Sequence, residues 1–128
     1  MRFCFIILCV TLLSPGVLCA KRMPPKPVKP VSANGITYWA DADGRKGYVV
    51  ATETSTDKEL WRVKVFKVHI KFWMEEDVQW VYITDLRISG HILLVRDERA
   101  RCYGVDLRKK GVKRASCPED WRPVSETK

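Results

Sequence analysis

The sequence lacks the residue patterns that mark most catalytic and metal-binding sites. It has two histidines, His69 and His91, with no metal-ligand spacing to each other or to a cysteine. It also has no His-Glu-x-x-His, no Cys-x-x-Cys and no glycine-rich phosphate loop after a strand. We therefore assign no catalytic residue, no metal ligand and no cofactor-binding residue from the sequence.

Cysteine is too scarce for a protein held together by a disulfide framework. Three of the five cysteines lie in the first 20 residues, which leaves Cys102 and Cys117 for the rest of the chain. In an oxidising compartment these two can form one bridge, which would hold the C-terminal tail against the body of the protein. The alternative is a pair of free thiols, and the sequence alone leaves the choice open.

Long apolar runs are confined to the N-terminus, where residues 1–20 have the features of a secretory signal peptide. Arg2 supplies a positive charge, residues 3–13 form an apolar run, and small residues at Cys19 and Ala20 suit a cleavage site. A membrane anchor is the alternative, but the run is too short and interrupted to span about 30 Å of hydrocarbon. We expect an exported protein, secreted or periplasmic, with no membrane span in the mature chain.

Cys19 stands where an exported lipoprotein would carry a lipidated cysteine. A bacterial lipobox has a small residue directly before that cysteine and a leucine three residues before it. Leu18 and Gly16 occupy those places here, so the match is poor. Whether Cys19 is modified stays open.

Proline is concentrated in one segment, because four of the seven prolines lie between residues 24 and 30. Proline removes a backbone donor and favours an extended chain, so we predict a basic, polyproline-like linker over residues 21–34. The β domain is expected at residues 35–115, and a C-terminal tail at residues 116–128.

Short apolar–polar alternations separated by turn residues fill the expected domain. This pattern is typical of β-strands joined by tight turns, and no segment has the period of an amphipathic helix of normal length. We predict an all-β fold, an antiparallel meander of about six or seven strands forming a twisted sheet or small open barrel, with irregular tails. The expected strands cover residues 36–40, 48–54, 60–72, 78–88, 92–96 and 101–107, with a weak last strand at Val112.

Aromatic residues are frequent along these expected strands. Trp39, Trp61, Trp73 and Trp80 lie in or beside them. We expect the four tryptophans to pack in the core, because large aromatic side chains bury much apolar surface. An aromatic platform for a ligand is the alternative.

The alternation changes phase inside residues 60–72. Trp61, Val63 and Val65 are apolar at odd positions, whereas from Phe66 onward the apolar residues fall at even positions. One face can stay buried through such a change only if an extra residue is inserted, so we predict a β-bulge at Val65-Phe66. The bulge places the intervening cations on one solvent face as a cationic stripe, formed by Arg62, Lys64, Lys67, His69 and Lys71.

Positive charge is in excess at the two ends of the domain. The net charge is +8, yet residues 32–107 carry eleven Lys/Arg and twelve Asp/Glu. With the cationic stripe, the basic C-terminal segment supplies the candidate anion-binding residues. The alternative is that both sets are ordinary solvated surface, as alternating lysines on a half-exposed sheet often are. The basic C-terminal segment consists of Arg108, Lys109, Lys110, Lys113 and Arg114.

Residues 47–63 and 91–107 resemble the repeat of quinoprotein-like β-propellers of the pyrroloquinoline-quinone type. The first stretch is similar to the family's strand, turn and Trp-bearing strand, with Trp61 as the docking tryptophan. The second is similar to its paired strands and ends in Asp106-Leu107. The resemblance implies antiparallel sheets in a small exported protein. Two repeats cannot close a ring of at least about four blades, so no cofactor residue is transferred.

These observations favour a small exported, non-enzymatic protein that acts through binding or structure at the cell envelope or outside the cell. Its partner would be another protein or an anionic polymer. One alternative is a polyanion-binding protein that holds nucleic acid, acidic glycan or anionic lipid through its basic ends and the cationic stripe. An enzyme is kept as a further alternative, although no acid–base pair stands out.

Overall fold

The computed structural model describes residues 26–41 and 43–121 of the chain. They form eight strands and two short 3₁₀ helices, which confirms the predicted all-β class. The expected signal peptide at residues 1–20, including Cys19, lies outside the described residues. So do the first part of the expected linker and the last seven residues of the tail.

The first sheet is an antiparallel meander of four strands in chain order. Asn34 and Gly35 form its first turn with positive φ angles of 52° and 76°, the backbone conformation of a tight two-residue hairpin. The strands are β1 (Val31–Ala33), β2 (Ile36–Asp41), β3 (Lys46–Glu53) and β4 (Glu59–Lys67).

The second sheet repeats this arrangement with the next four strands. They are β5 (Ile83–Ser89), β6 (Ile92–Asp97), β7 (Cys102–Asp106) and β8 (Val112–Ala115). The short helix η1 (Asp77–Gln79) precedes this sheet, and η2 (Glu119–Trp121) follows it.

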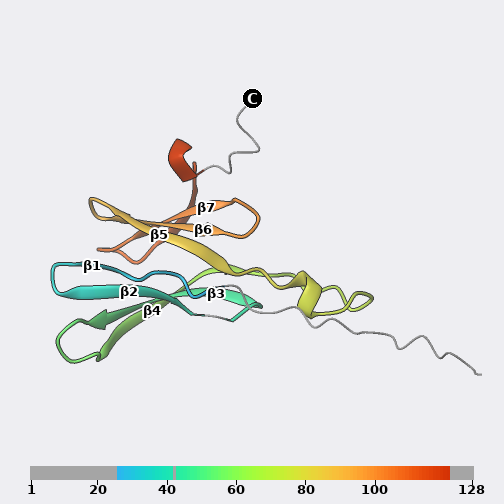
Figure 1. Ribbon diagram of the computed structural model, residues 1–128, viewed down its shortest axis with the longest axis horizontal. Helices are drawn as coiled ribbons and strands as arrows, with labels where there is room; N and C mark the ends of the chain where they lie inside the picture. Colours follow the sequence, from blue (N-terminus) through green and yellow to red (C-terminus); the bar gives the residue numbers. More distant parts are fainter. Residues whose placement is uncertain (1–25, 42, 122–128) are drawn as a thin grey trace, which may run out of the picture.

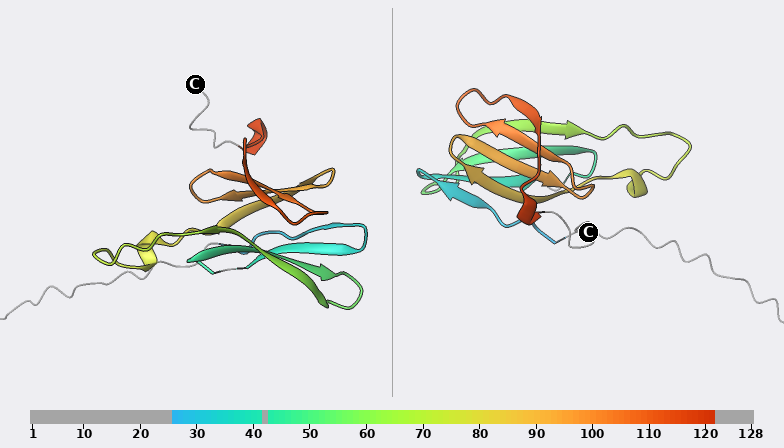
Figure 2. Two further views of the ribbon diagram at one scale, coloured as in Figure 1. Left: turned by 180° about the vertical axis from the view of Figure 1, so that it is seen from behind. Right: turned by 90° about the horizontal axis from the view of Figure 1, so that it is seen from above.

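The two sheets lie face to face as layers (Figures 1 and 2). Apolar side chains alternate along the strands, so each sheet turns one apolar face inward. The Phe66 ring of the first sheet stacks on the Tyr103 ring of the second, with centroids 5.5 Å apart. The core cluster draws on both sheets and comprises Tyr38, Val49, Ala51, Val65, Ile83, Leu86, Leu93, Val95, Tyr103 and Val105.

The predicted β-bulge is confirmed. Gly47 pairs with Phe66 and Tyr48 pairs with Lys64, so Val65 is the extra residue of β4. Val65 belongs to the core cluster and Phe66 packs against it, as the change of phase requires. A second register shift was not predicted. Ala51 pairs with Trp61 and Thr52 pairs with Glu59, so Leu60 has no partner residue in β3.

The strands expected at residues 60–72 and 78–88 are wrong at residues 68–72 and 78–82, which are not strand. β4 ends at Lys67, which pairs with Lys46, the first residue of β3. Residues 68–82, hereafter the arm, leave the sheets and return to β5 (Figure 1). Trp73, expected in the core, is exposed on this arm. The arm explains why one expected meander is split into two sheets.

The expected linker also contains structure. Val31–Ala33 pairs with residues 36–38 of β2 as an edge strand, so the domain begins before residue 35. Val28 packs against the core cluster as well. An edge position tolerates this proline-rich approach, because the outer side of such a strand needs no backbone donors.

Cys102 and Cys117, the possible pair in the sequence, form a disulfide with their Cα atoms 5.2 Å apart. The bridge holds the tail on the outer face of the second sheet, where Trp121 is buried. The Arg87 guanidinium lies 4.6 Å from the Trp121 ring centroid and also pairs with Asp120 at 2.6 Å. Hydrogen bonding from Arg87 lowers the pKa of the Asp120 carboxyl.

Removing the disulfide will destabilise the domain. The bridged residues are 15 apart, and closing a loop of that length is worth about 3 kcal/mol. We expect Cys102→Ala/Cys117→Ala to lose about 2–4 kcal/mol of unfolding free energy, measured by urea denaturation. Wild-type protein with and without a reductant provides the control, and an unchanged unfolding midpoint in both comparisons would contradict the prediction.

Gly47 is required because the Phe66 ring covers it. A Cβ at position 47 would overlap that ring, whereas one at Gly111 would meet nothing within 4 Å. We expect Gly47→Ala to lose about 1–3 kcal/mol of stability through overpacking. The matched variant Gly111→Ala should stay within about 0.5 kcal/mol of wild type. Urea denaturation of both variants tests this, and equal stabilities would refute it.

Candidate anion-binding site

The arm is fixed at its base to the turn between β2 and β3. The Val68 amide donates to the Arg45 carbonyl at 2.8 Å, and the Val81 amide donates to the Gly44 carbonyl at 3.0 Å. Each end of the arm therefore has a backbone bond to the same turn. An ion pair between Arg45 and Glu76 adds a contact farther along the arm.

The Gln79 side chain links the two halves of the arm through hydrogen bonds to its backbone. This side chain is only 7% exposed, and its Oε1 accepts a hydrogen bond from the Lys71 amide at 2.7 Å. Its Nε2 donates to the carbonyls of Lys71 at 3.0 Å, Met74 at 3.2 Å and Glu75 at 3.1 Å. Buried polar groups are stable only when bonded, so Gln79 holds residues 71–75 in one conformation.

The turn between β6 and β7 is organised by a buried carboxylate. Asp97 is 1% exposed and accepts from the Arg99 and Arg101 amides at 2.9 and 3.0 Å. It also accepts from Arg101 Nε at 2.8 Å and from the Tyr103 hydroxyl at 3.3 Å. Burial, with the Asp97 charge nearby, raises the pKa of Tyr103. These hydrogen bonds hold the backbone of the turn and so fix the positions of the Arg99 and Arg101 Cα atoms.

The arm and the β6–β7 turn are joined directly. The Tyr82 amide donates to Glu98 Oε1 at 2.8 Å, and the Glu98 amide donates to the Tyr82 carbonyl at 3.0 Å. Two segments that are distant in sequence therefore meet at one end of the molecule.

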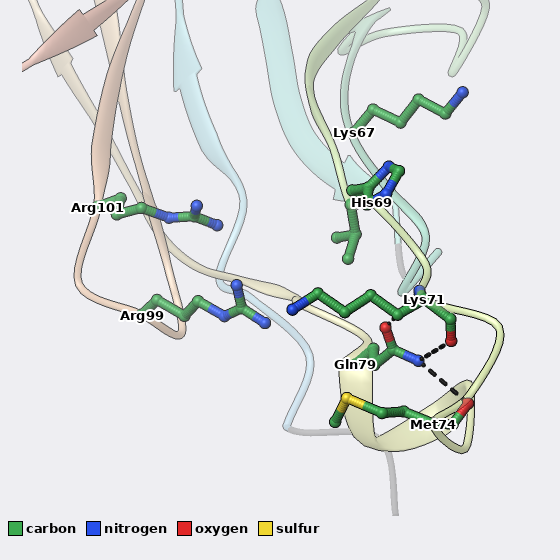
Figure 3. Close-up of a pocket in the computed structure, with 8 residues that line it drawn as sticks. Lys67, His69, Lys71, Met74, Gln79, Arg99 and Arg101 are labelled. Atoms are coloured by element: carbon green, nitrogen blue, oxygen red, sulfur yellow. Dashed lines mark hydrogen bonds between the residues drawn. The ribbon is translucent and has the colours of Figure 1, made fainter.

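A cavity of about 370 Å³ lies between the arm and this turn, and we call it the cationic pocket. Figure 3 shows the Lys71 ammonium and the Arg99 guanidinium pointing toward each other from opposite walls. Arg101 enters from the turn, whereas the charged end of Lys67 points away from both arginines. The lining consists of Lys67, Val68, His69, Lys71, Met74, Gln79, Arg99 and Arg101.

The charged side chains of this lining are all cations. Arg101 is neutralised by Asp97, to which its Nε donates at 2.8 Å. Within residues 26–41 and 43–121, no carboxylate forms an ion pair with Lys71 or Arg99. Two cations without an ion-pair partner among the described residues, placed around one cavity, favour an anion there. Their donors suit the oxygens of a phosphate, sulfate or carboxylate.

The structure divides the predicted cationic stripe. Arg62 lies on the outer face of the first sheet and pairs with Asp41 at 2.6 Å and Glu59 at 3.2 Å. The hydrogen bonds that Arg62 donates to Glu59 and Asp41 raise its pKa. Lys64, opposite Tyr48, also belongs to that outer face. The remaining three residues of the stripe, Lys67, His69 and Lys71, line the cationic pocket.

The basic C-terminal segment lies elsewhere, because its turn joins the opposite ends of the strands of the second sheet. Two of its cations rest on aromatic rings, with Lys110 5.8 Å from the Trp61 ring and Arg114 5.2 Å from the Tyr103 ring. Arg108 and Lys109 are exposed, and Lys109 and Lys113 border a second cavity of about 260 Å³. The ten predicted residues therefore do not form one surface.

Sequence reasoning missed the three other polar residues of the pocket, Gln79, Arg99 and Arg101, and its two apolar residues, Val68 and Met74. The signal for the two arginines was present, because connections in a meander alternate between the two ends of the strands. The connection into β5 and the connection from β6 to β7 must therefore fall at the same end. No comparable signal identified Gln79, whose role depends on how the arm folds.

Other kinds of site have no support in the described part of the chain. No three His, Cys, Asp or Glu side chains gather there closely enough to hold a metal ion. None of its helices is long and apolar enough to cross a membrane. No protein-family model matches the chain, and no curated protein matches it. The function of the site must therefore follow from its own geometry.

Gln79→Ala should loosen the arm and leave both sheets intact. The Lys71 amide would lose its partner, so we expect hydrogen exchange at residues 69–78 to accelerate about 5- to 100-fold, as loss of about 1–3 kcal/mol implies. Gln79→Glu keeps an acceptor for the Lys71 amide but loses the donors, so it should show an intermediate effect. Hydrogen–deuterium exchange followed by mass spectrometry measures the exchange rates of the arm in each variant. Unchanged protection of the arm in Gln79→Ala would show that Gln79 does not hold it.

Proposed function

We propose that this chain is an exported, non-enzymatic binding protein whose cationic pocket holds an anionic group of its partner. The observation that carries the proposal is the pairing of Lys71 and Arg99 around one cavity whose charged lining is entirely cationic (Figure 3). Lysine and arginine donate strong charge-assisted hydrogen bonds to phosphate, sulfate and carboxylate oxygens. The cavity of about 370 Å³ also has room for part of the molecule that carries the anion.

Export is supported by two independent features. The first 20 residues have the charge, the apolar run and the small residues of a signal peptide. The disulfide between Cys102 and Cys117 is of the kind that persists in oxidising compartments. Both features support a place of action at the cell envelope or outside the cell.

Binding is proposed in preference to catalysis because of the composition of the pocket. His69 is the lining residue best suited to proton transfer, and no carboxylate of the lining accompanies it. General acid–base catalysis usually depends on a histidine or carboxylate oriented by such a partner. The lysines and arginines of the lining supply attraction and hydrogen bonds, which a binding site needs.

We also propose that the two sheets are similar to blades of quinoprotein-like propellers, as the resemblance of residues 47–63 and 91–107 implies. Each sheet is a four-stranded antiparallel meander in chain order, which is also the organisation of a propeller blade. Two such sheets fall short of a closed ring, so the proposal carries no cofactor or activity to this chain.

Neutralising the pocket should weaken anion binding far more than neutralising the basic C-terminal segment. Inorganic phosphate and a heparin oligosaccharide are the probes, titrated at fixed low salt and followed by NMR shifts. We expect Lys71→Gln/Arg99→Gln to weaken both affinities at least about 100-fold, because each of the two charged hydrogen bonds is worth about 1.5–3 kcal/mol.

The matched control is Arg108→Gln/Lys109→Gln, which removes the same one lysine and one arginine at exposed positions. Its affinity should stay within about twofold of wild type at the same salt. Equal losses in both variants would show diffuse attraction by net charge, and the pocket proposal would then be wrong. A lack of saturable binding by the wild-type protein would also contradict it.

A further inference from the structure

The arm exposes an apolar tip that contributes little to the fold. Of the five large hydrophobic side chains exposed in the described part of the chain, four are on the arm. Phe72 is 93% exposed, Trp73 67%, Val78 53% and Met74 47%. The arm extends away from both sheets, so these side chains are presented to the surroundings (Figures 1 and 2). Exposed patches of this kind mark sites of interaction.

The tip is held in place. Gln79 binds the carbonyls at both sides of it, those of Lys71 and Glu75. The rings of Phe72 and Trp73 meet edge to face, with centroids 5.1 Å apart and planes at 88°. A partner would therefore meet a prearranged aromatic pair, and little entropy would be lost in ordering it.

The apolar tip is continuous with the cationic pocket. Met74 belongs to the tip and also lines the pocket. The Lys71 ammonium lies 5.8 Å from the Trp73 ring centroid and faces Arg99 across the cavity (Figure 3). Aromatic side chains beside lysine and arginine are the combination found where proteins meet the headgroup region of a bilayer.

The arm also carries three carboxylates. Glu76 is paired with Arg45, whereas Glu75 and Asp77 would be repelled by an anionic surface. Electrostatic attraction alone would therefore be weak here, and contact with such a surface would depend on the apolar tip as well as on Lys71 and Arg99. A lipid layer supplies both an apolar region and phosphate groups.

We propose that the arm docks on an anionic lipid layer, with Phe72 and Trp73 in the interfacial region and a lipid phosphate in the cationic pocket. This inference rests on the proposed anion-binding function and names lipid phosphate as its source. The tip lies on an arm that extends away from both sheets, so it can enter a lipid layer without the sheets following it (Figures 1 and 2).

Vesicle sedimentation tests the proposal. The probes are vesicles of phosphatidylcholine alone and of phosphatidylcholine mixed with phosphatidylglycerol. Wild-type protein should sediment with the mixed vesicles and much less with the neutral ones. Phe72→Ser/Trp73→Ser should reduce this partitioning about 10- to 100-fold, since two large side chains lose their apolar contact. Leu60→Ser, at an exposed hydrophobic residue outside the arm, should partition like wild type.

Two further measurements separate this inference from the proposed function. Phe72→Ser/Trp73→Ser should still bind inorganic phosphate like wild type, whereas Lys71→Gln/Arg99→Gln should lose both phosphate and vesicle binding. Brominated lipids should quench tryptophan fluorescence in wild type, and the quenching should largely vanish in Trp73→Phe.

Phosphate binding without vesicle binding would overturn the lipid inference and leave the proposed function standing. If the wild-type protein binds neither phosphate nor vesicles, the lipid inference and the proposed function are both wrong. Vesicle binding that survives Phe72→Ser/Trp73→Ser would also overturn the inference. A further result would overturn the inference: the protein does not bind vesicles but self-associates without lipid, and the self-association requires Phe72 and Trp73. The tip would then be a contact between copies of the chain.

Discussion

Apolar side chains from the inner faces of both sheets form one core, in which Val49, Leu93 and Val105 have no exposed surface. A domain of this size buries enough apolar area to be stable only if both sheets share that core. β4 contributes along its whole length because Val65 is inserted at a bulge, which keeps Phe66 on the inner face after the change of phase. The disulfide and Trp121 then pack against part of the outer face of the second sheet.

Sheet packing also creates the cationic pocket. The connection from β4 to β5 and the connection from β6 to β7 emerge at the same end, and the two hydrogen bonds between Tyr82 and Glu98 join them. Lys71 and Arg99 are distant in sequence but face the same cavity as a result (Figure 3). The stability that the core provides outweighs the electrostatic repulsion between these two cations. A bound anion would reduce that repulsion.

Local pattern predicted the all-β class and the bulge, and it identified the two cysteines available for a bridge, because each depends on neighbouring residues or on a small number of cysteines. It failed at residues 68–72 and 78–82, where apolar–polar alternation continues although β4 has ended at Lys67 and β5 has not yet begun. Alternation reports which side chains share a face, whereas pairing depends on backbone elsewhere in the chain. The pocket was only partly predicted for the same reason, since Arg99 and Arg101 join Lys71 through tertiary packing.

The central claim is that the two sheets pack face to face as one body, and the aromatic contact between Phe66 and Tyr103 tests it most directly. Their ring centroids lie 5.5 Å apart on opposite sheets. Nuclear Overhauser spectra of protein with labelled aromatic rings should show cross-peaks between the protons of these two rings. Absence of those cross-peaks, with both sheets otherwise folded, would contradict the shared core and the pocket built upon it.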